Sequence, residues 1–282
     1  MIGLSTTYYA TKGLSIYDSV LRTVELGFEV VELGAAHLYE DNVYEVLRKI
    51  KRDFPRIIFT IHTLFPPLRN KIWFNPAEGL SKLNKVIVDG LVNAASVLEA
   101  KIISIHPPIL NKLELGEKVI GNFNNLRMGS VIDEEVGRND FACLLEYIIK
   151  KAERSNTRVI IENLNTSKLI TFLDTGESFL NVFSRFKNTG LCLDVAHALE
   201  CGNLDNLMEL DGHIIEVHLH EWDYSCDGRA RGHLPIKDIA YFEPIKKIIK
   251  KGSVICIFEH GADVMEVDIL KEKSLLEKFL GL

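Results

Sequence analysis

The chain has 282 residues, a net charge of −6 and a pI near 5.9. An acidic chain has no general attraction to nucleic acid or to an anionic membrane surface, although a local basic groove remains compatible with this total. No apolar run approaches the roughly 20 residues that cross a bilayer. Residues 1–5 are typical of a strand and not of a signal peptide. The five cysteines are an odd set without a CxxC pair, which favours free thiols in a reducing cytoplasm.

Strand-like runs and helix-like segments alternate along the whole chain. The expected strands are 2–5, 30–33, 57–62, 102–106, 159–162, 191–194, 214–218 and 255–259. The helices expected after them, in the same order, are 15–26, 42–51, 76–98, 140–154, 176–186, 197–210, 236–250 and 264–280. Local signals mark some of the helix ends. Ser15 is a good N-cap with Asp18 at the capping-box position, Gly27 ends that helix, and Pro76 is typical of a first helical residue.

Eight strand–helix units in strict alternation predict an α/β fold of the (β/α)8 TIM-barrel type. The strands are almost continuously apolar, as expected where both faces of a parallel sheet are covered. A doubly wound open sheet is the structural alternative. We expect one domain over residues 1–282, with one irregularity. Residues 107–139 form a long loop between the fourth strand and its helix, and loops of this length inside a compact domain are usually functional.

Six of the predicted strands end on a histidine or a carboxylate. Because side chains alternate across a strand, each terminal residue shares a face with those two and four positions earlier. Parallel strands bring their carboxyl ends to one mouth of a barrel, where the active sites of such barrels lie. The six residues are His62, His106, Glu162, Asp194, His218 and Glu259. Three imidazoles and three carboxylates are a ligand set for zinc or manganese.

Each of these histidines taken alone is more often a hydrogen-bonded core residue than a metal ligand. Six such residues at six strand ends are rare by chance, so the joint pattern favours a metal site. Glu32, in the second strand, is a further carboxylate that points inward and could meet a substrate. His37, His213 and His260 do not end a predicted strand on its inward face, and we expect structural roles for them.

Several fragments resemble one known family. The segment from Asp194 to Gly202 is similar to the sixth-strand motif of the xylose-isomerase-like TIM barrels, which include endonuclease IV and the sugar isomerases and epimerases. The other matching fragments are Ile105-His106-Pro107, Ile161-Glu162-Asn163, His218-Leu219-His220 and Phe258-Glu259. In this order they cover nearly the whole chain, and they are specific for the superfamily but not for one activity.

The resemblance implies ligands for up to three metal ions. Glu162, Asp194, His218 and Glu259 would hold the divalent ion common to both branches. His62 and His106 would bind a second, endonuclease-type zinc with Glu162 as the bridge, and His197 and His233 match two of three ligands of a third. This chain departs from the endonuclease pattern at Arg231, where an aspartate ligand is expected, because a guanidinium cannot ligate a cation. It also lacks the characteristic DNA-inserting loops.

The first hypothesis is therefore a sugar or sugar-phosphate isomerase or epimerase that uses one divalent ion, zinc or manganese. By resemblance, Glu162 and Glu259 would transfer the proton from opposite faces of the substrate. The expected substrate-binding residues are His220, Arg229, Arg231 and Glu32, the arginines for an anionic group.

The second hypothesis is a zinc hydrolase related to endonuclease IV, with two ions and a phosphodiester, ester or amide substrate; the third is a non-catalytic binding barrel. A polyhydroxylated small molecule is the favoured partner and nucleic acid is not. The oligomeric state stays open, a homo-oligomer included.

Overall fold

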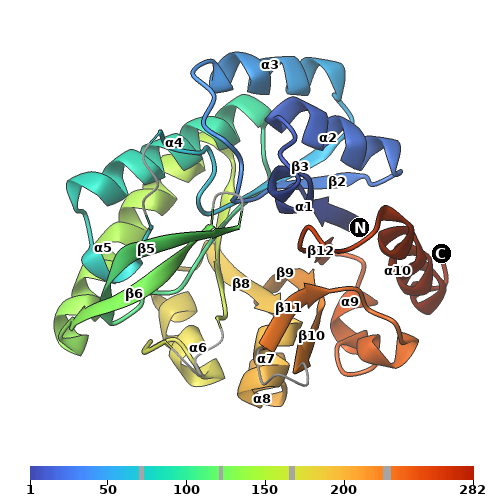
Figure 1. Cartoon of the computed structure of the whole chain (residues 1–282). Helices are drawn as coiled ribbons and strands as arrows, with labels where there is room; N and C mark the ends of the chain where they lie inside the picture. Colours follow the sequence, from blue (N-terminus) through green and yellow to red (C-terminus); the bar gives the residue numbers. More distant parts are fainter. Residues whose placement is uncertain (70–72, 121–122, 165–168, 225–229) are drawn as a thin grey trace.

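The computed structural model describes residues 1–69, 73–120, 123–164, 169–224 and 230–282, and for residues 115–126 and 223–231 it describes no side chains. Eight parallel strands close into a barrel in the order β1-β12-β9-β8-β7-β4-β3-β2 (Figure 1). These strands are β1 (Ile2–Ser5), β2 (Val30–Leu33), β3 (Ile58–His62), β4 (Ile102–Ile105), β7 (Arg158–Glu162), β8 (Thr189–Asp194), β9 (Ile214–Leu219) and β12 (Ile255–Phe258). The predicted TIM barrel is confirmed, and the open sheet is excluded because β1 pairs with both β2 and β12.

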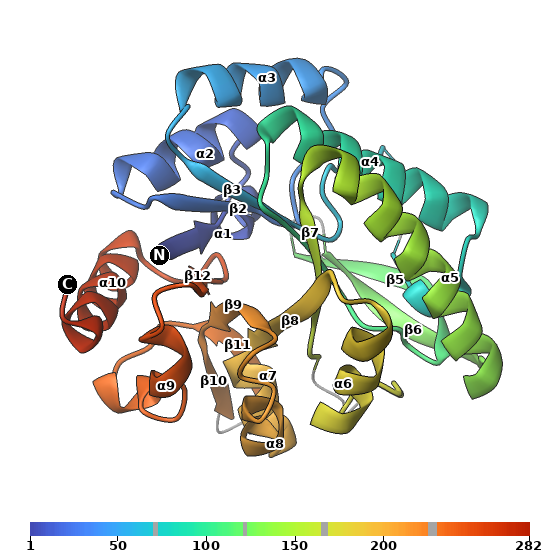
Figure 2. The same ribbon diagram turned by 180° about the vertical axis from the view of Figure 1, so that it is seen from behind.

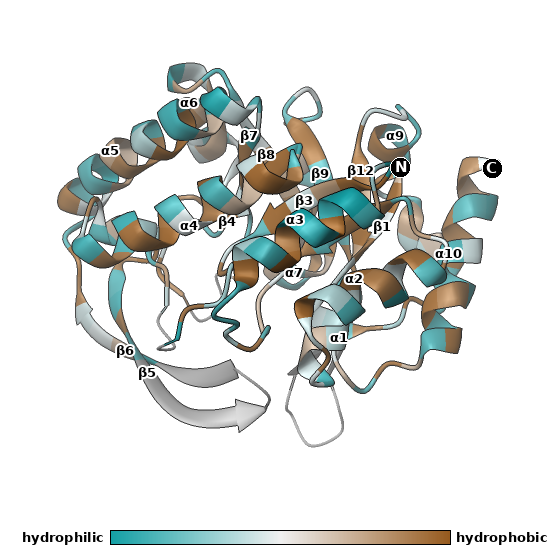
Figure 3. Ribbon diagram, turned by 90° about the horizontal axis from the view of Figure 1, so that it is seen from above, coloured by the Kyte–Doolittle hydropathy of each residue, from teal (hydrophilic) through white to brown (hydrophobic). Residues whose placement is uncertain are grey.

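The helices surround this barrel, and both chain ends lie on the same side of it (Figures 1 and 2). They are α1 (Thr7–Thr11), α2 (Ile16–Glu25), α3 (Val43–Asp53), α4 (Lys82–Leu98), α5 (Glu134–Ala152), α6 (Gly176–Arg185), α7 (Val195–Cys201), α8 (Leu204–Met208), α9 (Lys246–Ile249) and α10 (Glu266–Leu280). Polar and apolar residues alternate along α3 (Figure 3). Val43, Leu47 and Ile50 are buried, at the spacing of one helix face. None of the described helices is both long and apolar enough to span a membrane.

Local signals explain where the helices begin and break. The Ser15 hydroxyl accepts a hydrogen bond from the Asp18 amide at 3.1 Å, as predicted for an N-cap. The segment expected as one helix from Pro76 breaks at Gly79, whose φ of 57° is not helical, so α4 starts later at Lys82. The segment expected over 236–250 contains only a 3-10 turn and the short α9, because Pro244 has no N–H to donate and so interrupts the helical hydrogen bonds.

Two antiparallel ribbons were not predicted. Most of the segment expected as a loop over 107–139 forms β5 (Asn111–Ile120) and β6 (Phe123–Val131), which pair with each other in an antiparallel ribbon. The following helix α5 begins earlier than expected because the Asp133 carboxylate accepts from the Val136 amide at 3.1 Å. The second ribbon is β10 (Glu221–Tyr224) with β11 (Ala230–Leu234), directly after β9.

The apolar core has two parts. The larger part fills the space between the strands and the helices. The smaller part lies inside the barrel and consists of Val30, Ile102, Ile160, Cys192, Ile255 and Ile257. Polar side chains lie on the same inward strand faces nearer the carboxyl ends. The barrel interior is therefore apolar toward the amino-terminal ends of the strands and polar at their carboxyl ends.

Candidate metal centre

Four strand-end side chains meet at the carboxyl mouth of the barrel. Glu162 ends β7, Asp194 ends β8, His218 lies near the end of β9 and Glu259 follows β12. Asp194 and His218 are direct neighbours across the β8–β9 pair. One ligand atom from each of the four residues lies within 4.8 Å of all the others.

The spacing of these atoms fits a bound cation. Glu162 Oε1 lies 3.2 Å from His218 Nδ1, and Glu259 Oε2 lies 3.4 Å from the same nitrogen. Two ligands that each lie about 2.1 Å from a tetrahedral zinc are roughly 3.4 Å apart. Three carboxylates and one imidazole suit zinc, manganese or magnesium better than a soft metal. The residues therefore fit the divalent ion that the sequence implies.

Glu162 also contacts two histidines with its second oxygen. His62 Nε2 lies 2.8 Å from Glu162 Oε2, and His106 Nε2 lies 3.4 Å from it. The Nδ1–H of His62 donates to the backbone oxygen of Thr63 at 2.7 Å, which directs Nε2 toward the carboxylate. A ring N–H held by a backbone carbonyl is the usual arrangement of a metal-ligating histidine. Glu162 thus lies between His218 on one side and the His62–His106 pair on the other.

A second group of imidazoles surrounds Asp194. His220 Nε2 lies 3.0 Å from Asp194 Oδ2, and His197 Nδ1 lies 3.4 Å from the same oxygen. The ring of His233 stacks on that of His220 with centroids 4.3 Å apart, and its Nδ1–H donates to the backbone oxygen of Glu259 at 3.1 Å. Asp194 also caps α7, because its Oδ1 accepts from the His197 amide at 2.8 Å.

The predicted substrate-binding residues do not all lie at the mouth. His220 is there, beside Asp194. Arg229 lies outside the described residues, and for Arg231 only the backbone is described, paired with Asp223 in the β10–β11 ribbon. Glu32 is fully buried, with Oε2 3.2 Å from His218 Nε2, the ring nitrogen opposite the one that faces Glu162. A substrate contact of Glu32 stays a prediction from the sequence.

The pKa values of several side chains at the mouth are shifted far from their ordinary range. Burial opposes the charge on His62, yet Glu162 raises the pKa of His62 to about 10. Burial also opposes the charge on Glu162, but His62 and His218 hold the pKa of Glu162 well below its ordinary range. The pKa of Glu259 is likewise lowered well below its ordinary range, against burial, by His233 and His218. Both carboxylates are therefore ionised at neutral pH.

Two other imidazoles stay neutral. Burial and the neighbouring His62 lower the pKa of His106 to about 4. Burial and His220 lower the pKa of His233 to about 4. A neutral imidazole has a lone pair free for a metal ion or a substrate hydroxyl.

Several residues near the site were missed in the sequence. Glu216 lies two positions before His218 on the same strand face, so strand alternation would have identified it. Asn163 holds the backbone of Asp194, accepting from its amide at 2.8 Å and donating to its carbonyl at 2.9 Å. Trp73 stacks on His106 with centroids 5.4 Å apart, and Trp222 lies 6.2 Å from His197. No local sequence pattern distinguishes these tryptophans from core residues.

The three histidines for which we expected structural roles contact residues outside the four-residue group. His37 is buried, with Nε2 2.9 Å from the Thr6 hydroxyl. His213 stacks on Phe183 with centroids 5.1 Å apart. His260 is buried, with Nε2 2.7 Å from Glu272 on α10.

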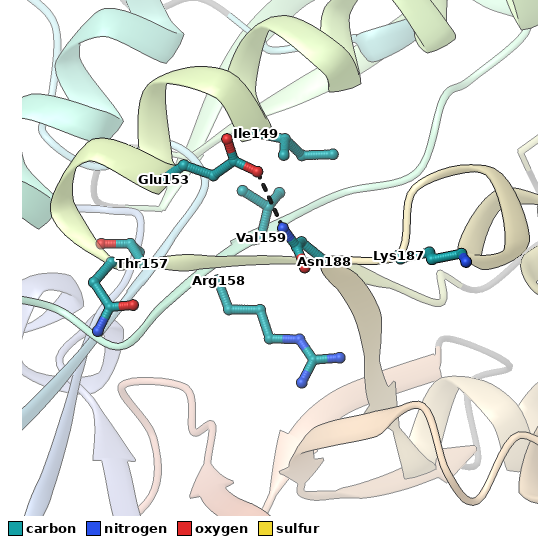
Figure 4. A pocket seen from close by; sticks show the side chains of 8 residues that line it. Ile149, Glu153, Thr157, Arg158, Val159, Lys187 and Asn188 are labelled. Carbon is teal, nitrogen blue, oxygen red and sulfur yellow. Dashed lines mark hydrogen bonds between the residues drawn. The ribbon is translucent and has the colours of Figure 1, made fainter.

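A separate pocket lies at the opposite, amino-terminal end of β7 and β8 (Figure 4). Its lining includes Arg158, Lys187 and Asn188, and the Asn188 amide donates to Glu153 at 3.0 Å. Glu153 is the one carboxylate among the lining residues, which include no histidine, so this pocket offers no metal donor set. The chemistry of the described residues is therefore concentrated at the carboxyl mouth.

The fold and the residues at the carboxyl mouth define this protein as a TIM barrel with a group of carboxylates and imidazoles at its strand ends. The chain belongs to the xylose isomerase-like TIM barrel family, whose model matches residues 20–275. This match confirms the family that the strand-end motifs indicated. A search of curated proteins found no match to the chain.

Solved structures with the same fold cover almost the whole chain. A D-tagatose 3-epimerase-like protein superimposes with a TM-score of 0.70 at 20% identity, and the alignment covers 99% of this chain and 97% of that protein's chain. D-psicose 3-epimerase, solved in the presence of D-fructose, has a TM-score of 0.70 at 15% identity, with 100% and 99% covered. The IolI protein with a bound zinc atom has a TM-score of 0.69 at 14% identity, with 99% and 98% covered. At these identities the likeness shows the shared fold.

Proposed function

We propose that this protein is a divalent-metal-dependent isomerase or epimerase of a sugar or sugar phosphate. The observation that carries the proposal is the position of two ionised carboxylates around one imidazole. Glu162 and Glu259 lie 3.2 and 3.4 Å from His218 Nδ1, and both have a strongly lowered pKa. The sugar epimerases among the structures of the same fold support this class of reaction.

The residues that would hold the ion are Glu162, Asp194, His218 and Glu259. A bound zinc or manganese ion would hold a neighbouring carbonyl and hydroxyl of the substrate and stabilise the negative charge that develops when a proton leaves. One such ion accounts for these four residues, and the zinc bound to the related IolI structure supports a divalent cofactor.

In this proposal Glu162 and Glu259 transfer the protons. Glu162 takes the proton from the carbon next to the substrate carbonyl, and Glu259 delivers a proton from the other side. Because Glu259 is ionised in the metal-free protein, it must first take up that proton from water. The roles of the two carboxylates reverse for the reverse reaction. Glu259 is 14% exposed, and His233, 39% exposed, lies 3.8 Å from it. His233 therefore gives Glu259 a route for proton exchange with water, which restores the starting state after each turnover.

His220 and the neutral His106 are the proposed partners of substrate hydroxyls. The walls of the mouth include Trp73 beside His106 and Trp222 beside His197, so apolar ring faces lie next to hydrogen-bonding groups. A polyhydroxylated molecule presents CH faces and hydroxyls to match such walls. For the arginines of the β10–β11 ribbon, contact with an anionic group stays a prediction from the sequence.

Proton exchange tests this function directly. The metal-loaded protein is incubated in D2O with a panel of ketoses and ketose phosphates, and deuterium at the carbon next to the carbonyl is followed by NMR. We expect exchange with at least one member and its loss on chelation. The proposal fails if a protein that holds its ion exchanges no proton of any member and instead cleaves an ester, amide or phosphodiester.

A zinc hydrolase is the second candidate, and one observation favours it. His62 and His106 both approach the second oxygen of Glu162, at 2.8 and 3.4 Å, although a mononuclear isomerase does not require them. Two ions bridged by Glu162 could activate a water and clamp a leaving oxygen. Arg231 in place of an aspartate ligand argues against the full endonuclease set. Two zinc ions per chain with cleavage of abasic DNA or a model phosphodiester would establish this alternative.

A further inference from the structure

Beneath the proposed metal centre lies a second carboxylate pair, Glu32 on β2 and Glu216 on β9. Both side chains are completely buried, and both approach the far nitrogen of His218. Glu32 Oε2 lies 3.2 Å from His218 Nε2, and Glu216 Oε1 lies 3.6 Å from it. In the barrel order β1 and β12 separate β2 from β9, so the contact between Glu32 and His218 crosses the barrel interior.

Hydrogen bonds satisfy this pair only in part. Among the residues that the structure describes, Glu32 Oε1 and Glu216 Oε2 are buried without a hydrogen-bond partner, and burial raises the pKa of Glu216. Polar atoms buried in this way cost stability, and well-packed apolar side chains are often at least as stable. A further polar contact of Glu216 is weak: the Cys192 thiol lies 3.9 Å from its Oε1.

The two nitrogens of His218 face two different pairs of carboxylates. Nδ1 faces Glu162 and Glu259 at the mouth, and Nε2 faces Glu32 and Glu216 below. A nitrogen that binds a cation has no proton, so a neutral His218 that binds through Nδ1 carries its proton on Nε2. Glu32, at the shorter distance, is the acceptor for that proton. Glu32 thereby selects the tautomer and the ring orientation that the centre requires.

We propose that Glu32 is a positioning residue, which accepts the Nε2–H of His218 and so holds Nδ1 as a metal ligand, with Glu216 as a weaker second acceptor. This inference rests on the metal centre proposed above but not on the reaction. It also gives Glu32 a different task from the substrate contact expected from the sequence.

Cobalt binding tests the inference without any activity measurement. Metal-free wild type and the variants Glu32→Met, Glu32→Gln and Glu216→Gln are titrated with Co²⁺, followed by its visible absorption bands and by calorimetry. We expect Glu32→Met to weaken Co²⁺ binding 10- to 100-fold, the usual effect of losing such a partner. Glu32→Gln keeps an acceptor oxygen and should recover part of the affinity. Glu216→Gln should have the smallest effect because its contact is longer.

The melting temperature of the metal-free proteins separates positioning from folding. Removing one partner of a buried pair lowers stability, so we expect metal-free Glu32→Met to melt below wild type and Glu32→Gln to melt closer to it. In both variants the Co²⁺ affinity should fall and the cobalt spectrum should change. Co²⁺ affinity within threefold of wild type overturns the inference, whatever the melting temperature. If Glu32→Met does not fold, Glu32→Gln decides by the same threshold. A wild type that binds no Co²⁺ would overturn the metal centre as well, so the two failures are distinguishable.

Discussion

His62 Nε2 lies 2.8 Å from Glu162 Oε2, although the two residues are 100 positions apart in the chain. The other nitrogen of His62 donates its hydrogen to the Thr63 carbonyl at 2.7 Å. Without an ion, Nε2 must therefore carry a second proton to face a carboxylate, and the His62 pKa of about 10 agrees with this. A proton and a metal ion thus compete for the same carboxylate.

We therefore predict that metal binding releases a proton from His62. An ion on Glu162 removes the charge partner of His62, and burial still opposes the imidazolium charge, so its pKa falls from about 10 to about 6.5 or below. Between these two pH values metal affinity should rise with pH, by up to about tenfold per pH unit. Calorimetry in two buffers of different ionisation enthalpy measures the released proton. His62→Gln is the control: it should bind the ion with no proton release from this position. The same heat in both buffers for wild type would contradict the prediction.

Removing the charge of Glu162 should stop turnover. Glu162→Gln loses a metal ligand and the proposed base together, and positioned bases typically contribute 10²- to 10⁴-fold. We expect kcat for proton exchange to fall by at least about 10³-fold. Glu259→Gln should reduce the same rate by a similar factor. Glu153→Gln, at the amino-terminal end of the barrel, is the matched control and should keep wild-type activity. Substantial activity in Glu162→Gln would mean that the reaction is centred on another strand.

Intrinsic fluorescence should report events at the mouth. The chain has two tryptophans, and both lie next to histidines of the site, Trp73 at 5.4 Å from His106 and Trp222 at 6.2 Å from His197. Co²⁺ binding should therefore quench most of the tryptophan emission, with the same midpoint as calorimetry. Trp73→Phe and Trp222→Phe should each retain the response of the other indole. Unchanged emission at saturating Co²⁺ would show that the ion lies elsewhere.

Strand alternation explains why so much of the centre could be predicted. A strand has a side-chain period of two, so a polar residue at the end of an apolar inward face must point into the barrel mouth. Glu162, Asp194, His218 and Glu259 are far apart in the sequence, and closure of the barrel gathers them within 4.8 Å. That step required only the order of the strands and their parallel direction.

Depth and cross-barrel contacts could not be predicted in the same way. Glu32 looked like one more inward carboxylate, but its partner His218 is 186 residues away on a strand that is not its neighbour. The side-chain period of a strand predicts which face a residue lies on. It does not predict which residue of a distant strand that side chain meets inside the barrel. The β5–β6 ribbon was missed for another reason. The sequence carries a Gly-Asn pair between its two strands, which is a hairpin signal, but the flanking segments lack the strict apolar–polar alternation of a half-buried strand.

Buried His37 gives a final prediction, on stability in acid. His37 is 4% exposed, it contacts the Thr6 hydroxyl and the Phe65 ring, and burial lowers its pKa to about 3. The unfolded chain takes up a proton at this position near pH 6.5, whereas the folded chain does not until about pH 3. Folding stability should therefore be lost progressively as pH falls from about 6.5 to about 3. The loss from His37 alone should reach roughly 2 kcal/mol at pH 5 and about 4 kcal/mol at pH 3.

Urea unfolding at pH 7, 6 and 5 measures this dependence for wild type and His37→Gln, both metal-free. Glutamine cannot take up a proton, so the variant should lose about 2 kcal/mol less than wild type between pH 7 and pH 5. Groups that titrate elsewhere affect both proteins equally and cancel in the difference, because His37 contacts no charged side chain among its described partners. Parallel curves for the two proteins would mean that His37 gains a proton while the chain is folded, and that water reaches the ring.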